Sequence, residues 1–108
     1  MDNINASVTV KGVTYTLPEV STEQYLEYCD VRDPIADPDR MYTRQDFYAM
    51  ADQIVKLYGN QFTRADLLGP EGLTPGEVIV QFSMIEVVLM KQVDKSIAAL
   101  KENFTTGA

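Results

Sequence analysis

The sequence contains no histidine and only one cysteine, Cys29. The absence of histidine removes the commonest general base, the commonest metal ligand and every Ser-His or Cys-His catalytic arrangement. A single cysteine cannot form a disulfide within the chain, which fits a reducing cytoplasm. We therefore expect no enzyme, no catalytic residues, no cofactor and no metal site. Cys29 is expected to act as a small hydrophobic residue of the core.

Basic residues and long apolar runs are also scarce. Nine lysines and arginines stand against sixteen aspartates and glutamates, which gives a formal net charge of −7. Such a charge repels phosphate backbones, so binding to nucleic acid is not expected. No stretch reaches the ~18 uninterrupted apolar residues of a membrane span, and Met1–Asn5 has neither the basic nor the apolar region of a signal peptide. These features favour a cytoplasmic protein that binds no membrane.

The sequence is otherwise that of one globular domain. Its 108 residues are 45% hydrophobic and 23% charged, without repeats, low-complexity tracts or a linker. The fold class we predict is α+β, mostly α, with an N-terminal β-hairpin packed on three main helices, the C-terminal one long. The single domain 1–108 is expected to contain a hairpin at about 6–17, helices at about 22–32, 44–58 and 75–104, and a loop at 33–42.

Local signals place these elements. Apolar residues alternate with serine and threonine through 7–17, and Lys11-Gly12 interrupts them as a two-residue hairpin turn. Ser21-Thr22-Glu23-Gln24 reads as a capping box, and Pro34 disfavours helix at the residue before it, so the first helix is predicted to end near Arg32. The residues of that helix expected to face the core are Tyr25, Leu26, Tyr28 and Cys29.

The longest helix is apolar on two sides in its first half. Thr74, Pro75 and Glu77 fit its N-cap, N1 and N3 positions. One apolar stripe is formed by Val78, Phe82, Ile85, Leu89, Val93, Leu100 and Phe104. A second stripe on the far side consists of Val80, Met84, Val87 and Val88. Either neighbouring elements bury both stripes, or the second stripe is an exposed surface for a partner or for a second copy of the chain.

An acidic segment precedes the second main helix. Asp30, Asp33, Asp37 and Asp39 lie close together in the sequence, but their spacing lacks the order and the terminal Glu of a calcium loop. Aspartate before proline is typical of turns, so solvated turns are the preferred interpretation. The residues predicted to bind a partner are therefore those of the second stripe, Val80, Met84, Val87 and Val88.

The order of elements resembles that of a known family. The segments S-V-T-V-K-G-V-T-Y-T-L (7–17), Y-G-N-Q-F-T-R-A-D-L-L-G (58–69) and L-T-P-G-E (73–77) follow one another with a short helix and an acidic loop between the first two. This pattern resembles the tail assembly chaperones of long-tailed bacteriophages and prophages. The resemblance covers most of the chain, but it rests on elements and lengths and not on a catalytic motif.

The resemblance implies a function. Members of that family act in the host bacterial cytoplasm, bind the tape-measure protein, help recruit tail-tube protein subunits during tail morphogenesis, and are absent from the mature virion. By resemblance, the partners here are the tape-measure and tail-tube proteins. The surplus apolar surface of the C-terminal helix makes that helix a candidate for homo-oligomer contacts. The alternative from the acidic composition is a DNA mimic or regulatory protein that sequesters a host nucleic-acid-binding protein.

Overall fold

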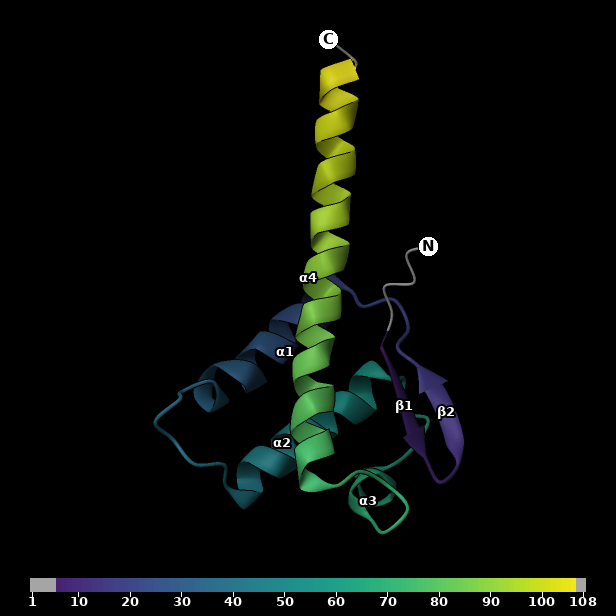
Figure 1. Ribbon diagram of the computed structural model, residues 1–108, viewed down its shortest axis with the longest axis vertical. Helices are drawn as coiled ribbons and strands as arrows, with labels where there is room; N and C mark the ends of the chain where they lie inside the picture. The colour runs from purple at the N-terminus through teal and green to yellow at the C-terminus, as the bar shows by residue number, and fades with distance from the viewer. Residues whose placement is uncertain (1–5, 107–108) are drawn as a thin grey trace.

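The computed structural model describes the backbone of residues 6–106 and the side chains of residues 6–102. It contains a two-stranded antiparallel hairpin and four helices, the last of which is much longer than the others (Figure 1). The elements are β1 (Ser7–Val10), β2 (Val13–Thr16), α1 (Thr22–Ile35), α2 (Arg44–Leu57), α3 (Arg64–Leu68) and α4 (Pro75–Thr106). The predicted α+β, mostly α fold is confirmed.

The hairpin has the predicted two-residue turn at Lys11-Gly12. Val8 pairs with Tyr15 and Val10 with Val13. Lys11 and Gly12 both have positive φ, 53° and 78°, as a type I′ turn requires at its two central residues. The turn is tied to the rest of the domain because the Lys11 amide donates to the carbonyl of Glu71 at 2.9 Å. Val8 and Val10 are buried, so β1 faces the core.

Capping boxes begin α1, α2, α3 and α4, and those at Ser21 and Thr74 are the ones predicted above. The Ser21, Thr43 and Thr63 side chains each accept a hydrogen bond from the amide three residues ahead. At the start of α4, the Thr74 hydroxyl accepts from the Glu77 amide, and the Glu77 carboxylate accepts from the Thr74 amide at 2.9 Å. Each box satisfies amides that have no partner within the helix.

The predicted end of α1 was wrong. The helix continues through Pro34 to Ile35, one turn beyond Arg32, and the irregular segment begins only at Ala36. The Ala36 amide donates to the Arg32 carbonyl at 2.9 Å, which closes the last turn despite the proline. Arg32 itself is held by Asp33 and by Glu86 of α4. The tertiary contact between Arg32 and Glu86 outweighs the local preference of Asp33 for an extended backbone.

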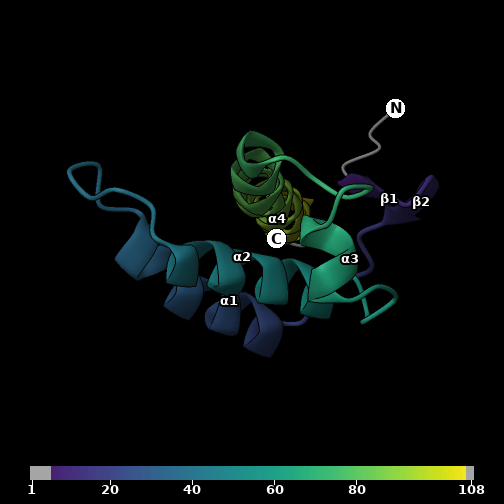
Figure 2. The same cartoon turned by 90° about the horizontal axis from the view of Figure 1, so that it is seen from below.

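The helices form layers. Figure 2 shows α2 between α1 and α4, and α2 contacts both of them. Tyr28 of α1, Ile54 of α2 and Ile85 of α4 are fully buried in this arrangement. Leu26 was expected in the core but is exposed, because it lies on the face of α1 away from Tyr28. Cys29 is partly buried.

The second half of α4 extends beyond the other elements (Figure 1). The molecule measures 56 × 35 × 22 Å along its principal axes, and its long axis is drawn vertically in that view. The first apolar stripe is buried as predicted at Val78, Phe82, Ile85 and Leu89. Beyond Leu89 the stripe is exposed at Val93 and Leu100, and the predicted member Phe104 lies outside the residues whose side chains are described.

Candidate partner-binding surface

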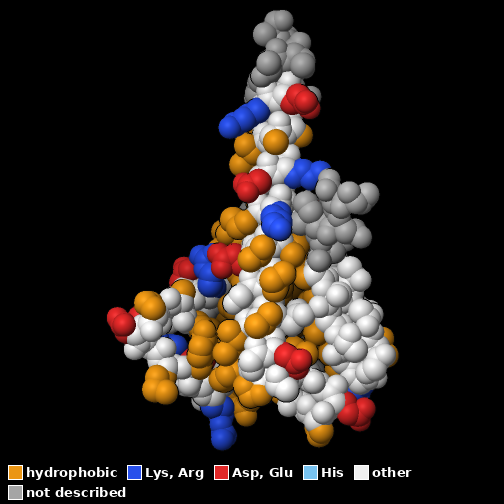
Figure 3. Space-filling model, in the orientation of Figure 1, with side chains coloured by type: hydrophobic (Ala, Val, Ile, Leu, Met, Phe, Trp, Pro, Cys, Tyr) orange, Lys and Arg blue, Asp and Glu red, His pale blue; other side chains and the backbone are white. Residues whose placement is uncertain are grey.

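Three of the four residues predicted to bind a partner form an exposed apolar strip on α4. Val80, Met84 and Val87 are spaced by four and three residues, so they lie on one side of the helix. Their exposed fractions are between 42% and 59%. We call these three residues the outer strip. Figure 3 shows hydrophobic side chains along the face of α4 that is turned to the viewer.

Val88 does not belong to this surface. Only 4% of its surface is exposed, so the prediction that it is open in the isolated subunit was wrong. Val88 lies three residues after Ile85 and next to Leu89, at the border of the buried stripe. Gln81, one heptad earlier on the same side of α4, donates to the Ser7 carbonyl at 2.7 Å. That side of the helix therefore faces β1.

The outer strip is flanked by two shallow hollows. One, of about 330 Å³, lies between α4 and the hairpin and is lined by Val80 together with Val8, Thr9 and Leu73. The other, of about 150 Å³, lies between α4 and the α1–α2 layer and is lined by Ile79, Ser83 and Glu86 among others. A partner helix laid along the outer strip would find side-chain-sized recesses on both sides of it.

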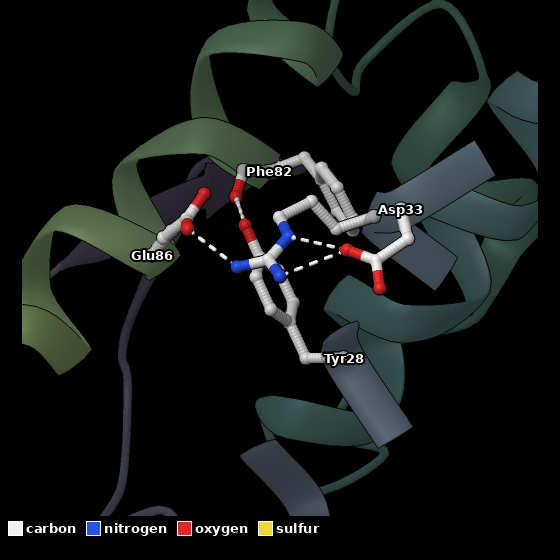
Figure 4. A network of polar contacts seen from close by, with 5 residues as sticks. Tyr28, Asp33, Phe82 and Glu86 are labelled. Atoms are coloured by element: carbon white, nitrogen blue, oxygen red, sulfur yellow. Dashed lines mark hydrogen bonds and ion pairs between the residues drawn. The ribbon is translucent and has the colours of Figure 1, made fainter. Parts of the chain in front are cut away.

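A polar network holds the helix that carries the strip (Figure 4). The buried hydroxyl of Tyr28 donates to the Phe82 carbonyl at 2.5 Å. Their rings also pack together, with centroids 4.6 Å apart. Arg32 bridges Asp33 of its own helix and Glu86 of α4. The strip therefore has a fixed orientation relative to α1.

The electrostatics of the network keep Tyr28 and Arg32 each in one protonation state. Burial raises the pKa of the Tyr28 phenol well above its ordinary value, so the phenol stays a hydrogen-bond donor at neutral pH. Hydrogen bonding to Asp33 raises the pKa of Arg32, so its guanidinium remains charged. The network is thus a structural clamp between α1 and α4.

The acidic segment is occupied by internal contacts. Asp33 accepts from Arg32, and Asp37 accepts from the Asp39 amide at 2.9 Å. Among the residues that the structure describes, no group of three or more acidic or cysteine side chains is arranged to hold a metal ion. Within the same residues, every helix is too short or too polar to span a lipid bilayer.

A second exposed apolar surface includes Val93 and Leu100, which the sequence places on the first stripe without indicating that they are exposed. Val93, Ile97 and Leu100 lie on the protruding part of α4 with exposed fractions of 44–54%. A groove of about 680 Å³ lies at the foot of this part, between α4 and the segment that joins β2 to α1. The periodicity of 93–100 indicated an apolar face, but only the three-dimensional arrangement shows that no described element covers it.

A family model described as "Phage tail chaperone protein" matches residues 1–103, nearly the whole chain. No curated protein and no solved structure gives a significant match.

Proposed function

This chain belongs to the phage tail chaperone family, and from that premise we propose that it binds the tape-measure protein and keeps it soluble during tail assembly. The observation that carries the proposal is the outer strip, where Val80, Met84 and Val87 are exposed on a rigidly held helix. A long helical client has apolar stripes that need cover until the tail assembles. Docking of such a stripe against an exposed helix face is a common mode of recognition.

The composition of the strip suits a client that varies along its length. Met84 is unbranched and flexible, so it adapts to side chains of different shape. The net charge of −7 on this chain makes copies of the chaperone repel one another, which opposes aggregation. Binding of this kind requires no catalytic step.

The proposal extends to the place and stage of action. We place the protein in the host bacterial cytoplasm, where tails assemble, and outside the mature virion. By holding the tape-measure protein, it would also bring tail-tube protein subunits to their template. The outer strip offers three main apolar side chains, so its contact with the client is small. A small contact allows the client to be released as the tube grows.

The test is co-expression with the tape-measure protein encoded by the same phage. Met84→Asp should leave the chaperone folded, since Met84 is exposed, but should lower the soluble fraction of the client and abolish co-purification. Leu26→Asp is the matched control, because it places the same charge at an exposed apolar position on another helix. If both variants solubilise the client like the wild type, or if both fail equally, the outer strip is not the client surface.

A further inference from the structure

The protruding part of α4 carries a regular apolar seam. Val93, Ile97 and Leu100 follow one another at spacings of four and three residues, which is the repeat of a helix that pairs with another helix. The seam is on a different side of α4 from the outer strip, because it continues the stripe that is buried lower down at Ile85 and Leu89. Its occupant must therefore approach from the side on which the body of the domain lies.

The groove at the foot of the protruding part restricts the shape of the partner that can lie along the seam. It is lined by Leu17, Val20 and Tyr25 on one wall and by Leu89, Gln92 and Val93 on the other. The seam leads directly into it, because Val93 belongs to both. A rod-shaped element that lies along the seam toward the body would end in this groove.

We propose that the occupant is a second copy of this chain, whose α4 lies antiparallel along the seam. The part of α4 after Met90 spans residues 91–106, or roughly 24 Å at 1.5 Å per residue. Two such segments can overlap along their whole length, and each helix end then reaches the groove of the other copy. The two bodies lie at opposite ends of the pair, so they do not collide. The arrangement has a two-fold axis and closes as a dimer.

The charges that flank the seam favour this direction. Asp94 directly follows Val93, and Lys101 directly follows Leu100. The two charged residues are seven positions apart, so they occupy equivalent positions on the same flank of the seam. An antiparallel pair brings each Asp94 opposite Lys101 of the other copy, which forms two symmetric ion pairs. Lys101 has a contact within its own chain, and the three donors of its ammonium group allow a further bond. A parallel pair would set Asp94 at the level of Leu89 and form no such pair.

The first test is sedimentation of the purified full chain without any client, so its result does not depend on the proposed function. The wild type should pass from monomer to dimer at micromolar concentrations, because a seam this short is smaller than a standard interface of about 800 Å² per partner. Ile97→Lys should weaken dimerisation by about tenfold or more, since each copy would bury an unpaired ammonium. Ala98→Lys, on the exposed side of α4 away from the seam, is the matched control and should dimerise like the wild type.

The second test addresses direction. Asp94→Lys and Lys101→Asp should each weaken dimerisation by about three- to tenfold at low salt, because each replaces two attractive pairs with two repulsive ones. The double variant restores both pairs and should recover the wild-type affinity. Circular dichroism verifies that all variants keep their helix content. A wild type that stays monomeric, an Ile97→Lys variant that dimerises normally, or a double variant weaker than either single one would overturn the proposal.

Discussion

Met84 and Val88 lie one turn apart on α4, yet their surroundings differ. Met84 faces solvent, whereas Val88 is packed beside Ile85 and Leu89. The boundary between the exposed partner surface of α4 and the core therefore passes between these two side chains. The same substitution at the two positions should have opposite consequences for folding.

Val88→Asp should unfold the domain or destabilise it by more than about 3 kcal/mol, because a carboxylate would lose its hydration without gaining a partner. Met84→Asp should change the free energy of unfolding by less than about 0.5 kcal/mol, as is usual for exposed positions. Urea denaturation followed by circular dichroism measures both. A folded and stable Val88→Asp variant would show that Val88 is open in the isolated subunit after all.

Gly72 fixes the turn from which α4 begins. A Cβ atom at this position would lie 2.1 Å from the Leu67 carbonyl oxygen, which is far inside contact distance. That oxygen also accepts a hydrogen bond from the Leu73 amide at 2.7 Å, so it is not free to move. At Gly76, in the first turn of α4, an added Cβ would meet nothing within 4 Å.

Gly72→Ala should therefore lower the free energy of unfolding by about 1–3 kcal/mol, through displacement of the turn. Gly76→Ala should leave it unchanged or raise it by up to about 1 kcal/mol, because alanine favours the helix. Thermal unfolding of the two variants beside the wild type is a sufficient measurement. Equal melting temperatures for both variants would mean that the turn shifts at no cost.

Asp46 gives the domain a specific dependence on acid. Arg40 donates two hydrogen bonds of 2.7 Å to its carboxylate, and the Thr43 amide donates a third. The Arg40 bonds, followed by the Thr43 amide, lower the pKa of Asp46 to about 2 in the folded state. Because the unfolded value is about 3.9, this contribution to stability is complete above that pH and is lost as pH falls toward 2.

Asp46→Asn should accordingly be less stable than the wild type at pH 7, and the difference should shrink as pH falls from about 4 to about 2. Chemical denaturation at a series of pH values measures the difference. Asp30→Asn, on the exposed surface of α1, serves as the control for a change in net charge alone. A difference between Asp46→Asn and the wild type that does not narrow below pH 4 would contradict the role assigned to the carboxylate.

At the scale of elements, α4 is one helix in two environments. Its first half contacts α2 and contributes buried side chains from Val78 to Leu89. In its second half, the described residues 93–102 are all exposed. An isolated helix of about 16 residues is only marginally stable in water, so the second half depends on the first as its nucleus.

Hydrogen exchange should follow this division. Amides of residues 78–90 should exchange only through global unfolding, whereas those of residues 93–102 should exchange through local fraying, by orders of magnitude faster in dilute protein. Protection of residues 93–102 should rise with protein concentration if α4 pairs with a second copy. Uniform protection along α4 at every concentration would contradict the difference between the two halves.

Elements with local causes could be predicted from the sequence. Lys11-Gly12 and the boxes at Ser21, Thr43 and Thr74 each act over three or four residues, so their effect is visible in the chain itself. The errors arose where distant contacts decide. Pro34 stays helical because Arg32 is anchored to Glu86, more than fifty residues away. Val88 is buried and Leu26 exposed because of how the helices pack, which periodicity alone does not determine.

At the scale of the whole molecule, the shape is that of a small body with a rod. The Cα radius of gyration is 15.9 Å, whereas a compact domain of this length has about 13 Å. The difference comes from the protruding half of α4. Two apolar surfaces follow one another along α4. The outer strip lies where α4 packs on the body, and the seam of Val93, Ile97 and Leu100 lies on the protruding half.

This separation predicts that client binding and self-association can be removed one at a time. Met84 and Ile97 are 13 residues apart on one helix, or about 20 Å, which is beyond the range of direct coupling between substitutions. Met84→Asp should lose the tape-measure protein and still dimerise. Ile97→Lys should remain monomeric and still bind the client, and the double variant should show both defects without a further loss. Sedimentation and co-purification of the three variants measure the two activities side by side. If Ile97→Lys alone abolishes client binding, the chaperone acts as a dimer, and the two surfaces form one functional site.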